Sequence, residues 1–255
     1  MKKYPMLFSV FVVVLVVVGI YFLVKNKAID NSVIPEQEVK KDTLILIDPA
    51  FSETKTYTNP TAYTTFDVKY PQFKNSSAEF NKKIEDVMQN AIAEHKQISE
   101  ENWKSRINSR RAGEVVDEFP KDGEKFELQA SWKPAQVNAD FISILISISA
   151  YAGGAHGYEN LYSFNYDVKN KKEISLALLF PNDPNYLKTI SEFSRVALHK
   201  QFRDNNDSML IDGTEPTREN FNIFTFTPSY ITFYFSQYQV GPYVIGSPSV
   251  VMPRK

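Results

Sequence analysis

FISILISISAY, residues 141–151, has isoleucine at every second position from Ile142 to Ile148. Side chains alternate between the two faces of a strand, so this pattern predicts a strand with one buried face. Residues 126–132 alternate in the same way, and residues 134–138 carry the turn signal between the two segments. We therefore expect an antiparallel hairpin at the centre of the protein.

Two longer segments have apolar side chains at helical spacing. The first begins at Ser76, which forms a capping box with Glu79, and runs to His95 and on toward Arg111. The second begins at Asp183-Pro184, where an N-cap residue is followed by proline at the first helical position, and reaches about residue 202.

Shorter elements fill the rest of the chain after the N-terminal region. A short helix is expected at residues 175–180 and a polar loop at residues 205–219. Further strands are expected at residues 43–47, 63–70, 161–168, 221–226, 230–235 and 249–252. The resulting order is βαββ followed by βαββ. It predicts an α+β fold, with antiparallel sheet or sheets and the two long helices packed on one face.

The N-terminus carries an apolar run, Met6–Val24, with no charged residue in it. A helix of about 20 such residues crosses the ~30 Å hydrocarbon core of a bilayer. We expect residues 1–24 to be an uncleaved transmembrane anchor with its N-terminus in the cytoplasm. Because Lys2 and Lys3 resemble the charged start of a signal peptide, a cleaved signal is the alternative.

The polar composition of the remaining chain predicts a globular region. Because only five residues precede Met6, and so short a stub normally stays inside, we expect this region to lie outside the cytoplasm, at the cell membrane. Residues 25–42 read as a flexible tether. The two halves that follow are expected at residues 43–152 and 153–255.

Charge and composition exclude several kinds of partner and site. The 29 basic and 30 acidic residues nearly balance and form no long basic block, so nucleic acid is not expected as a partner. The absence of cysteine excludes disulfides, thiolate chemistry and cysteine-based metal sites. We find no motif for a catalytic residue, a metal or a cofactor, and expect none of them.

Two loops display residues that could contact a ligand. Gly153-Gly154-Ala155-His156-Gly157 follows the long isoleucine-rich strand, and a Gly/Pro-punctuated loop begins at Tyr238. The glycines permit a tight connection, and His156 is either a structural hydrogen-bonding residue or a functional one. The candidate ligand-binding residues are Tyr151, Gly153, Gly154, His156, Tyr158, Tyr238 and Tyr243.

A run of motifs in one order gives a more specific signal than any of them alone. They are the segments at residues 151–157, 164–167, 174–180, 220–221 and 235–243. Together they resemble the extracytoplasmic domain of unknown function that is shared by the RsiV anti-sigma factor and the peptidoglycan deacetylase PdaC. The upstream segment Val68-Lys69-Tyr70-Pro71 is similar to the N-terminal half that usually accompanies this domain, so the resemblance covers about residues 44–253.

The resemblance implies an α+β domain outside the cytoplasm that binds lysozyme in RsiV and accompanies a separate catalytic domain in PdaC. Only Met1–Pro5 precede the anchor, and we find no deacetylase metal motif, so sigma-factor signalling and deacetylation are not expected here. What remains is a membrane-anchored binding module for a lysozyme-like protein or for peptidoglycan glycan. The alternatives are a structural envelope protein and a hydrolase that pairs His156 with Asp167 or Glu159.

Overall fold

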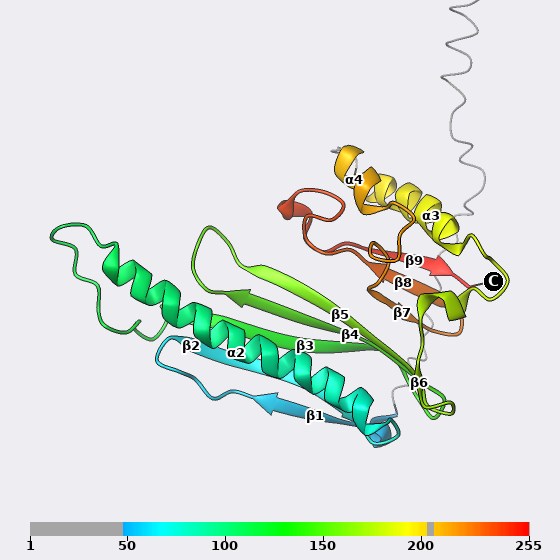
Figure 1. Ribbon diagram of the computed structural model, residues 1–255, viewed down its shortest axis with the longest axis horizontal. Helices are drawn as coiled ribbons and strands as arrows, with labels where there is room; N and C mark the ends of the chain where they lie inside the picture. Colours follow the sequence, from blue (N-terminus) through cyan, green and yellow to red (C-terminus); the bar gives the residue numbers. More distant parts are fainter. Residues whose placement is uncertain (1–47, 203–206, 255) are drawn as a thin grey trace, which may run out of the picture. The chain divides into compact units, whose positions relative to one another are not determined.

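The computed structural model describes residues 48–202 and 207–254, which form two β-sheets and three α-helices (Figure 1). The first sheet has the strand order β1-β2-β3-β4-β5-β6 and the second the order β7-β8-β9. The strands are β1 (Ser52–Tyr57), β2 (Thr64–Phe73), β3 (Phe126–Val137), β4 (Phe141–Tyr151), β5 (Tyr158–Asp167), β6 (Lys172–Glu173), β7 (Phe224–Phe226), β8 (Tyr230–Tyr234) and β9 (Ser249–Pro253). The helices are α2 (Ala78–Asn108), α3 (Tyr186–Gln201) and α4 (Asp207–Gly213), with single 3₁₀ turns η2 (Pro49–Phe51), η3 (Leu176–Leu179) and η4 (Tyr243–Ile245).

Helix α2 lies along the six-stranded sheet and covers one of its faces (Figure 1). The isoleucines of β4 point to this face, as the alternation predicted. They pack against the apolar stripe of α2, which consists of Phe80, Ile84, Met88 and Ile92. The main core of the protein therefore lies between α2 and the sheet.

The expected hairpin of β3 and β4 is confirmed as antiparallel, but its turn lies later than predicted. Strand β3 continues past Pro134, with a register shift between Pro134 and Gln136. The chain reverses at Asn138, whose side-chain Oδ1 accepts hydrogen bonds from the backbone N–H groups of Asp140 and Phe141. This register shift is a β-bulge, which leaves one residue of β3 unpaired with β4. Proline is tolerated in strands at such bulges.

Not all strand neighbours are antiparallel, which corrects the prediction from sequence. Strands β2 and β3 pair in parallel, with Thr64 opposite Phe126 and Val68 opposite Ala130. The reason is connectivity: α2 carries the chain back along the sheet, and a strand–helix–strand crossover returns in the same direction.

The two predicted helix starts are each displaced toward the C-terminus. Ser77, not Ser76, caps α2, because the Ser77 hydroxyl accepts from the Phe80 backbone N–H at 3.2 Å. Helix α3 begins at Tyr186. Asp183 lies before the helix, and its carboxylate accepts hydrogen bonds from the Asn185 backbone N–H and the Thr189 hydroxyl. The short helix α4 lies where a polar loop was expected.

The second sheet carries α3, so the two long helices do not pack on one face of a single sheet as expected. Ile190 and Leu198 of α3 share a core with Phe233 of β8 and Val250 of β9. Each sheet thus has its own helix and its own apolar core.

Buried polar contacts join the two sheets on the face away from α2. The Ser143 hydroxyl accepts from the Phe226 backbone N–H at 2.8 Å and donates to Asn165 Oδ1 at 2.6 Å. Asn165 Nδ2 in turn donates to the Phe224 backbone carbonyl at 2.8 Å. Since Ser143 lies at one end of β4, this contact leaves the other end of the same face uncovered.

Part of the N-terminal prediction lies outside the described residues: the anchor at 1–24, the tether at 25–42 and the strand at 43–47. Within residues 48–202 and 207–254, no helix is long and apolar enough to span a membrane. All described residues fall in one compact unit. The boundary at residue 153 stays a prediction, and hydrogen bonding places β5 in the same sheet as β4.

Candidate functional site

The two displayed loops meet at one surface. His156, in the β4–β5 connection, stacks on the ring of Tyr243 with centroids 4.0 Å apart and planes 26° apart. The hydroxyl of Tyr238 lies 3.3 Å from Nε2 of His156. We call His156, Tyr238 and Tyr243 the aromatic cluster. It joins the first sheet's loop to the loop after β8.

Hydrogen bonds to one carbonyl hold the aromatic cluster in place. The Gly157 carbonyl accepts from the Tyr243 hydroxyl at 3.1 Å and lies 2.8 Å from Nδ1 of His156. A carbonyl only accepts, so Nδ1 of His156 donates in this contact. The Gly157 carbonyl thus ties both rings to the β4–β5 connection.

The glycines of the β4–β5 connection make this arrangement possible. Gly153 and Gly154 have φ of +93° and +99°, a region that residues with a Cβ rarely adopt. A Cβ on Gly157 would lie 2.8 Å from the Ala150 carbonyl oxygen. Tyr238 itself has φ of +66°, an uncommon conformation for a non-glycine residue that is found at functional sites.

An open hollow of about 360 Å³, here called the sheet groove, lies beside the aromatic cluster on the uncovered face of the first sheet. Strand register aligns Gln129, Ser149 and Glu159 across its floor, with Glu127 opposite Tyr151 in the next row. The wall comes from the C-terminal loop: Gln237 Oε1 accepts from the Glu159 backbone N–H at 3.1 Å. The lining residues are Glu127, Gln129, Ser149, Ala150, Tyr151, Gly157, Tyr158, Glu159, Gln237 and Tyr243.

The remaining predicted residues lie around the groove with different orientations. The Tyr151 hydroxyl donates to the Gly154 carbonyl at 3.2 Å, and its ring packs edge-on against Phe126. Tyr158 pairs with Ala150, whose side chain belongs to the core under α2. Burial, and then the carboxylate of Glu94 on α2, raise the pKa of Tyr158. Its hydroxyl therefore lies toward α2 and away from the aromatic cluster.

Residues on the groove floor were not predicted as binding residues from sequence. Glu127, Gln129 and Ser149 occupy the polar positions of two half-buried strands, which sequence reasoning assigns to a solvated face. The one available signal was the alternation itself, which placed them on a common face. Gln237 is a loop residue with no comparable signal.

The geometry contradicts one of the proposed catalytic pairs. Asp167 pairs with Phe141 and Tyr158 with Ala150, so they lie nine residues apart along β5, roughly 30 Å at strand spacing. Asp167 accepts hydrogen bonds from Asn170 there. The carboxylate of Glu159 accepts from the Ser147 hydroxyl. In the described part of the chain, no three metal-ligating side chains of His, Asp or Glu are grouped to hold an ion.

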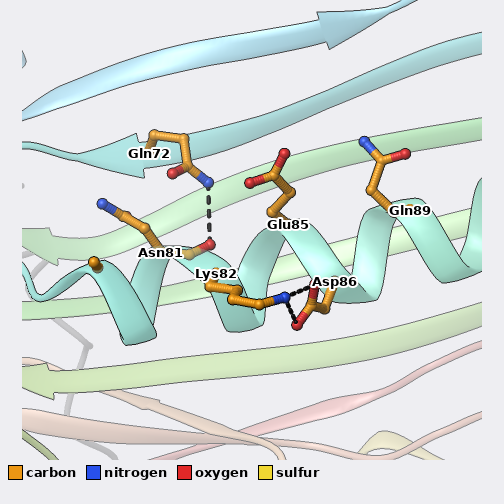
Figure 2. Close-up of a pocket in the computed structure, with 7 residues that line it drawn as sticks. Gln72, Asn81, Lys82, Glu85, Asp86 and Gln89 are labelled. Atoms are coloured by element: carbon orange, nitrogen blue, oxygen red, sulfur yellow. Dashed lines mark hydrogen bonds and ion pairs between the residues drawn. The ribbon is translucent and has the colours of Figure 1, made fainter.

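A second hollow, of about 630 Å³, lies beside α2 and β2 (Figure 2). Gln72 Nε2 donates to the Asn81 carbonyl at 3.2 Å, and Lys82 forms an ion pair with Asp86 at 2.6 Å. Figure 2 shows Glu85 and Gln89 directed toward the same side of the helix as Gln72. No aromatic side chain lines this hollow, so we place the candidate site at the aromatic cluster.

Two family models match separate parts of the chain. The family described as deacetylase PdaC matches residues 57–159, and a family described as a protein of unknown function, DUF3298, matches residues 178–255. The aromatic cluster therefore takes His156 from the first region and both of its tyrosines from the second. The resemblance identified from sequence is confirmed.

A curated protein is similar to this chain over part of its length. The peptidoglycan-N-acetylmuramic acid deacetylase PdaC of Bacillus subtilis is 28% identical over 158 residues, which cover 57% of this chain and 33% of that protein. The chain thus matches about a third of its curated relative.

Two solved structures of the DUF3298 family match this chain. One is from Bacteroides fragilis, with TM-score 0.52 and 14% identity, and one from Pseudomonas aeruginosa, with TM-score 0.49 and 13% identity. Each match covers 79% of this chain and 89% of the other. The likeness to the Bacteroides fragilis protein supports an α+β fold of the DUF3298 type. Residues 57–159 thus match the family described as deacetylase PdaC, and residues 178–255 match the family of unknown function DUF3298.

Proposed function

We propose that this protein is a binding module for a target in the bacterial cell envelope, held outside the cytoplasm by the apolar segment Met6–Val24. The observation that carries the proposal is the aromatic cluster. Two loops from different sheets bring His156, Tyr238 and Tyr243 together beside an open groove. An exposed tyrosine such as Tyr238 suits recognition, because it offers an apolar ring face and a hydroxyl that forms hydrogen bonds.

The chemistry of the cluster supports binding over a purely structural role. Tyr238 is 52% exposed despite its positive φ, and Val244 beside Tyr243 is 86% exposed. The hydrolase alternative has less support, since Asp167 lies at the far end of β5 and Glu159 is held by Ser147.

The matched relative supports an envelope target. Its name states an activity on peptidoglycan, and this chain matches about a third of it. The deacetylase activity itself is not part of the proposal. The target is peptidoglycan glycan or a lysozyme-like protein that acts on the same glycan.

Calorimetry on residues 45–255 tests the proposal, with lysozyme and soluble peptidoglycan fragments as titrants. We expect saturable binding to one of them and a loss of at least tenfold in affinity in the His156→Ala, Tyr243→Ala double variant. Leu178→Ala is the matched control: Leu178 is 54% exposed and lies in η3, outside the groove lining. Absence of binding to both titrants, or equal loss in the control, would contradict the proposal.

A further inference from the structure

We infer that the sheet groove binds a saccharide that carries a free amine, such as an amino sugar without its N-acetyl group. This inference rests on the proposed function and names the ligand class of the same site. It follows from three features of the groove: the hydrogen-bonding groups of its floor, the aromatic ring on its wall and the sign of its charges.

The floor is a regular array of hydrogen-bonding side chains. Gln129, Ser149 and Glu159 lie directly opposite one another on three neighbouring strands, about 4.8 Å apart per strand. A glutamine side chain donates and accepts, a serine hydroxyl does both, and a carboxylate accepts. Such a row matches a ligand that presents hydroxyl groups at short, regular intervals, as a sugar chain does.

The wall adds an aromatic surface and a fixed amide. Tyr243 lines the groove, with one ring face against His156 and its hydroxyl on the Gly157 carbonyl. The C–H face of a sugar ring packs on aromatic rings as other apolar surfaces do. Gln237 bonds the Glu159 backbone and so ties the wall to the floor.

The charged groups lining the groove are carboxylates. Glu127 and Glu159 line it, no lysine or arginine does, and neither carboxylate forms an ion pair with a described residue. By contrast, Asp67, which lies opposite Gln129 on the neighbouring strand β2, forms an ion pair with Lys69 at 2.8 Å. An anionic ligand would be repelled, and a neutral N-acetyl sugar would bring no opposite charge to Glu127 or to Glu159, whose carboxylate already accepts from the Ser147 hydroxyl. An ammonium group gives a charge-assisted hydrogen bond, roughly twice as strong as a neutral one.

The size of the groove favours a sugar over a basic protein surface. A volume of about 360 Å³ lies in the range of small-ligand pockets. A protein interface instead buries roughly 800 Å² on each partner around a core depleted in charges. The floor here is polar, with the carboxylates of Glu127 and Glu159 on the strands at either side of β4.

Two oligosaccharides that differ only at nitrogen provide the test: a glucosamine tetramer and the N-acetylglucosamine tetramer. In calorimetry at pH 6 with residues 45–255, we expect the amine-bearing tetramer to bind at least tenfold more tightly. The Glu127→Gln, Glu159→Gln double variant keeps the shape of the groove and should reduce this preference to about twofold. Glu192→Gln, on α3 and outside the groove, is the matched control and should retain it.

Tetralysine separates sugar recognition from simple attraction of cations. It carries charge without sugar rings and should bind at least tenfold more weakly than the glucosamine tetramer. Equal binding of the two sugars, or binding of tetralysine as tight as that of the amino sugar, overturns the inference. If neither sugar binds but lysozyme does, and His156→Ala, Tyr243→Ala abolishes that binding, the inference fails while the proposed function stands. If neither sugar, nor lysozyme, nor soluble peptidoglycan fragments bind, both fail.

Discussion

At the scale of single residues, His95 places a titratable side chain in the main core without hydrogen bonds to its ring nitrogens. It is fully buried on α2, and neither ring nitrogen has a hydrogen-bond partner. Its ring packs edge-on against Phe66. Burial lowers the pKa of His95 from 6.5 to about 4, because the charged imidazolium would lose its hydration. His95 is therefore neutral at physiological pH.

This residue makes the stability of the protein depend on pH. The folded-state pKa lies below the unfolded value, so the unfolded chain binds the proton more readily between pH 6.5 and about 4. Stability should fall as pH drops through this window, by up to about 3 kcal/mol from this group. Urea unfolding at pH 7, 5.5 and 4.5 measures the effect.

The variant His95→Leu isolates the contribution of His95 to the pH dependence of stability. The variant should lose less stability than the wild type over the same pH steps, whatever its stability at pH 7. Parallel pH dependence in the two proteins would show that His95 does not titrate in this way.

At the scale of elements, the spacing of apolar residues predicted the strands and helices that depend on local sequence. The alternating strands β3 and β4 and the apolar stripe of α2 were predicted because each buries one face against a single layer. The parallel pairing of β2 with β3 was not, since the partner of a strand depends on where the intervening helix returns the chain. Helix α4 was missed because its surroundings are rich in polar and turn-forming residues.

Capping is an element-scale property that the structure assigns to a different serine from the one predicted. Ser77→Ala should destabilise the protein by about 1 kcal/mol, because the Phe80 backbone N–H loses its acceptor. Ser76→Ala is the matched control, since the Ser76 hydroxyl donates to backbone carbonyls that precede the helix. Chemical denaturation of both variants measures the difference, and a larger loss in Ser76→Ala would contradict the assignment of the cap.

At the scale of the whole molecule, the candidate site depends on contact between the two family regions. The aromatic cluster was partly predictable, because glycines and tyrosines mark both loops as turns with exposed rings. Their convergence was not, because it is set by the buried contact of Ser143 and Asn165 with β7. The groove floor could not be predicted from sequence for a similar reason, because its residues become a site only when the C-terminal loop supplies a wall.

The measurement that tests the central claim most directly is NMR mapping of residues 45–255 during titration with soluble peptidoglycan fragments and, separately, with lysozyme. The account predicts that one ligand shifts the ring resonances of His156, Tyr238 and Tyr243 together with the amides of Gln129 and Glu159. Tyr186, which stacks on Phe180 in the second core, serves as the internal control and should not shift. Shifts confined to other surfaces, or none with either ligand, would contradict the claim that the aromatic cluster and its groove form the binding site.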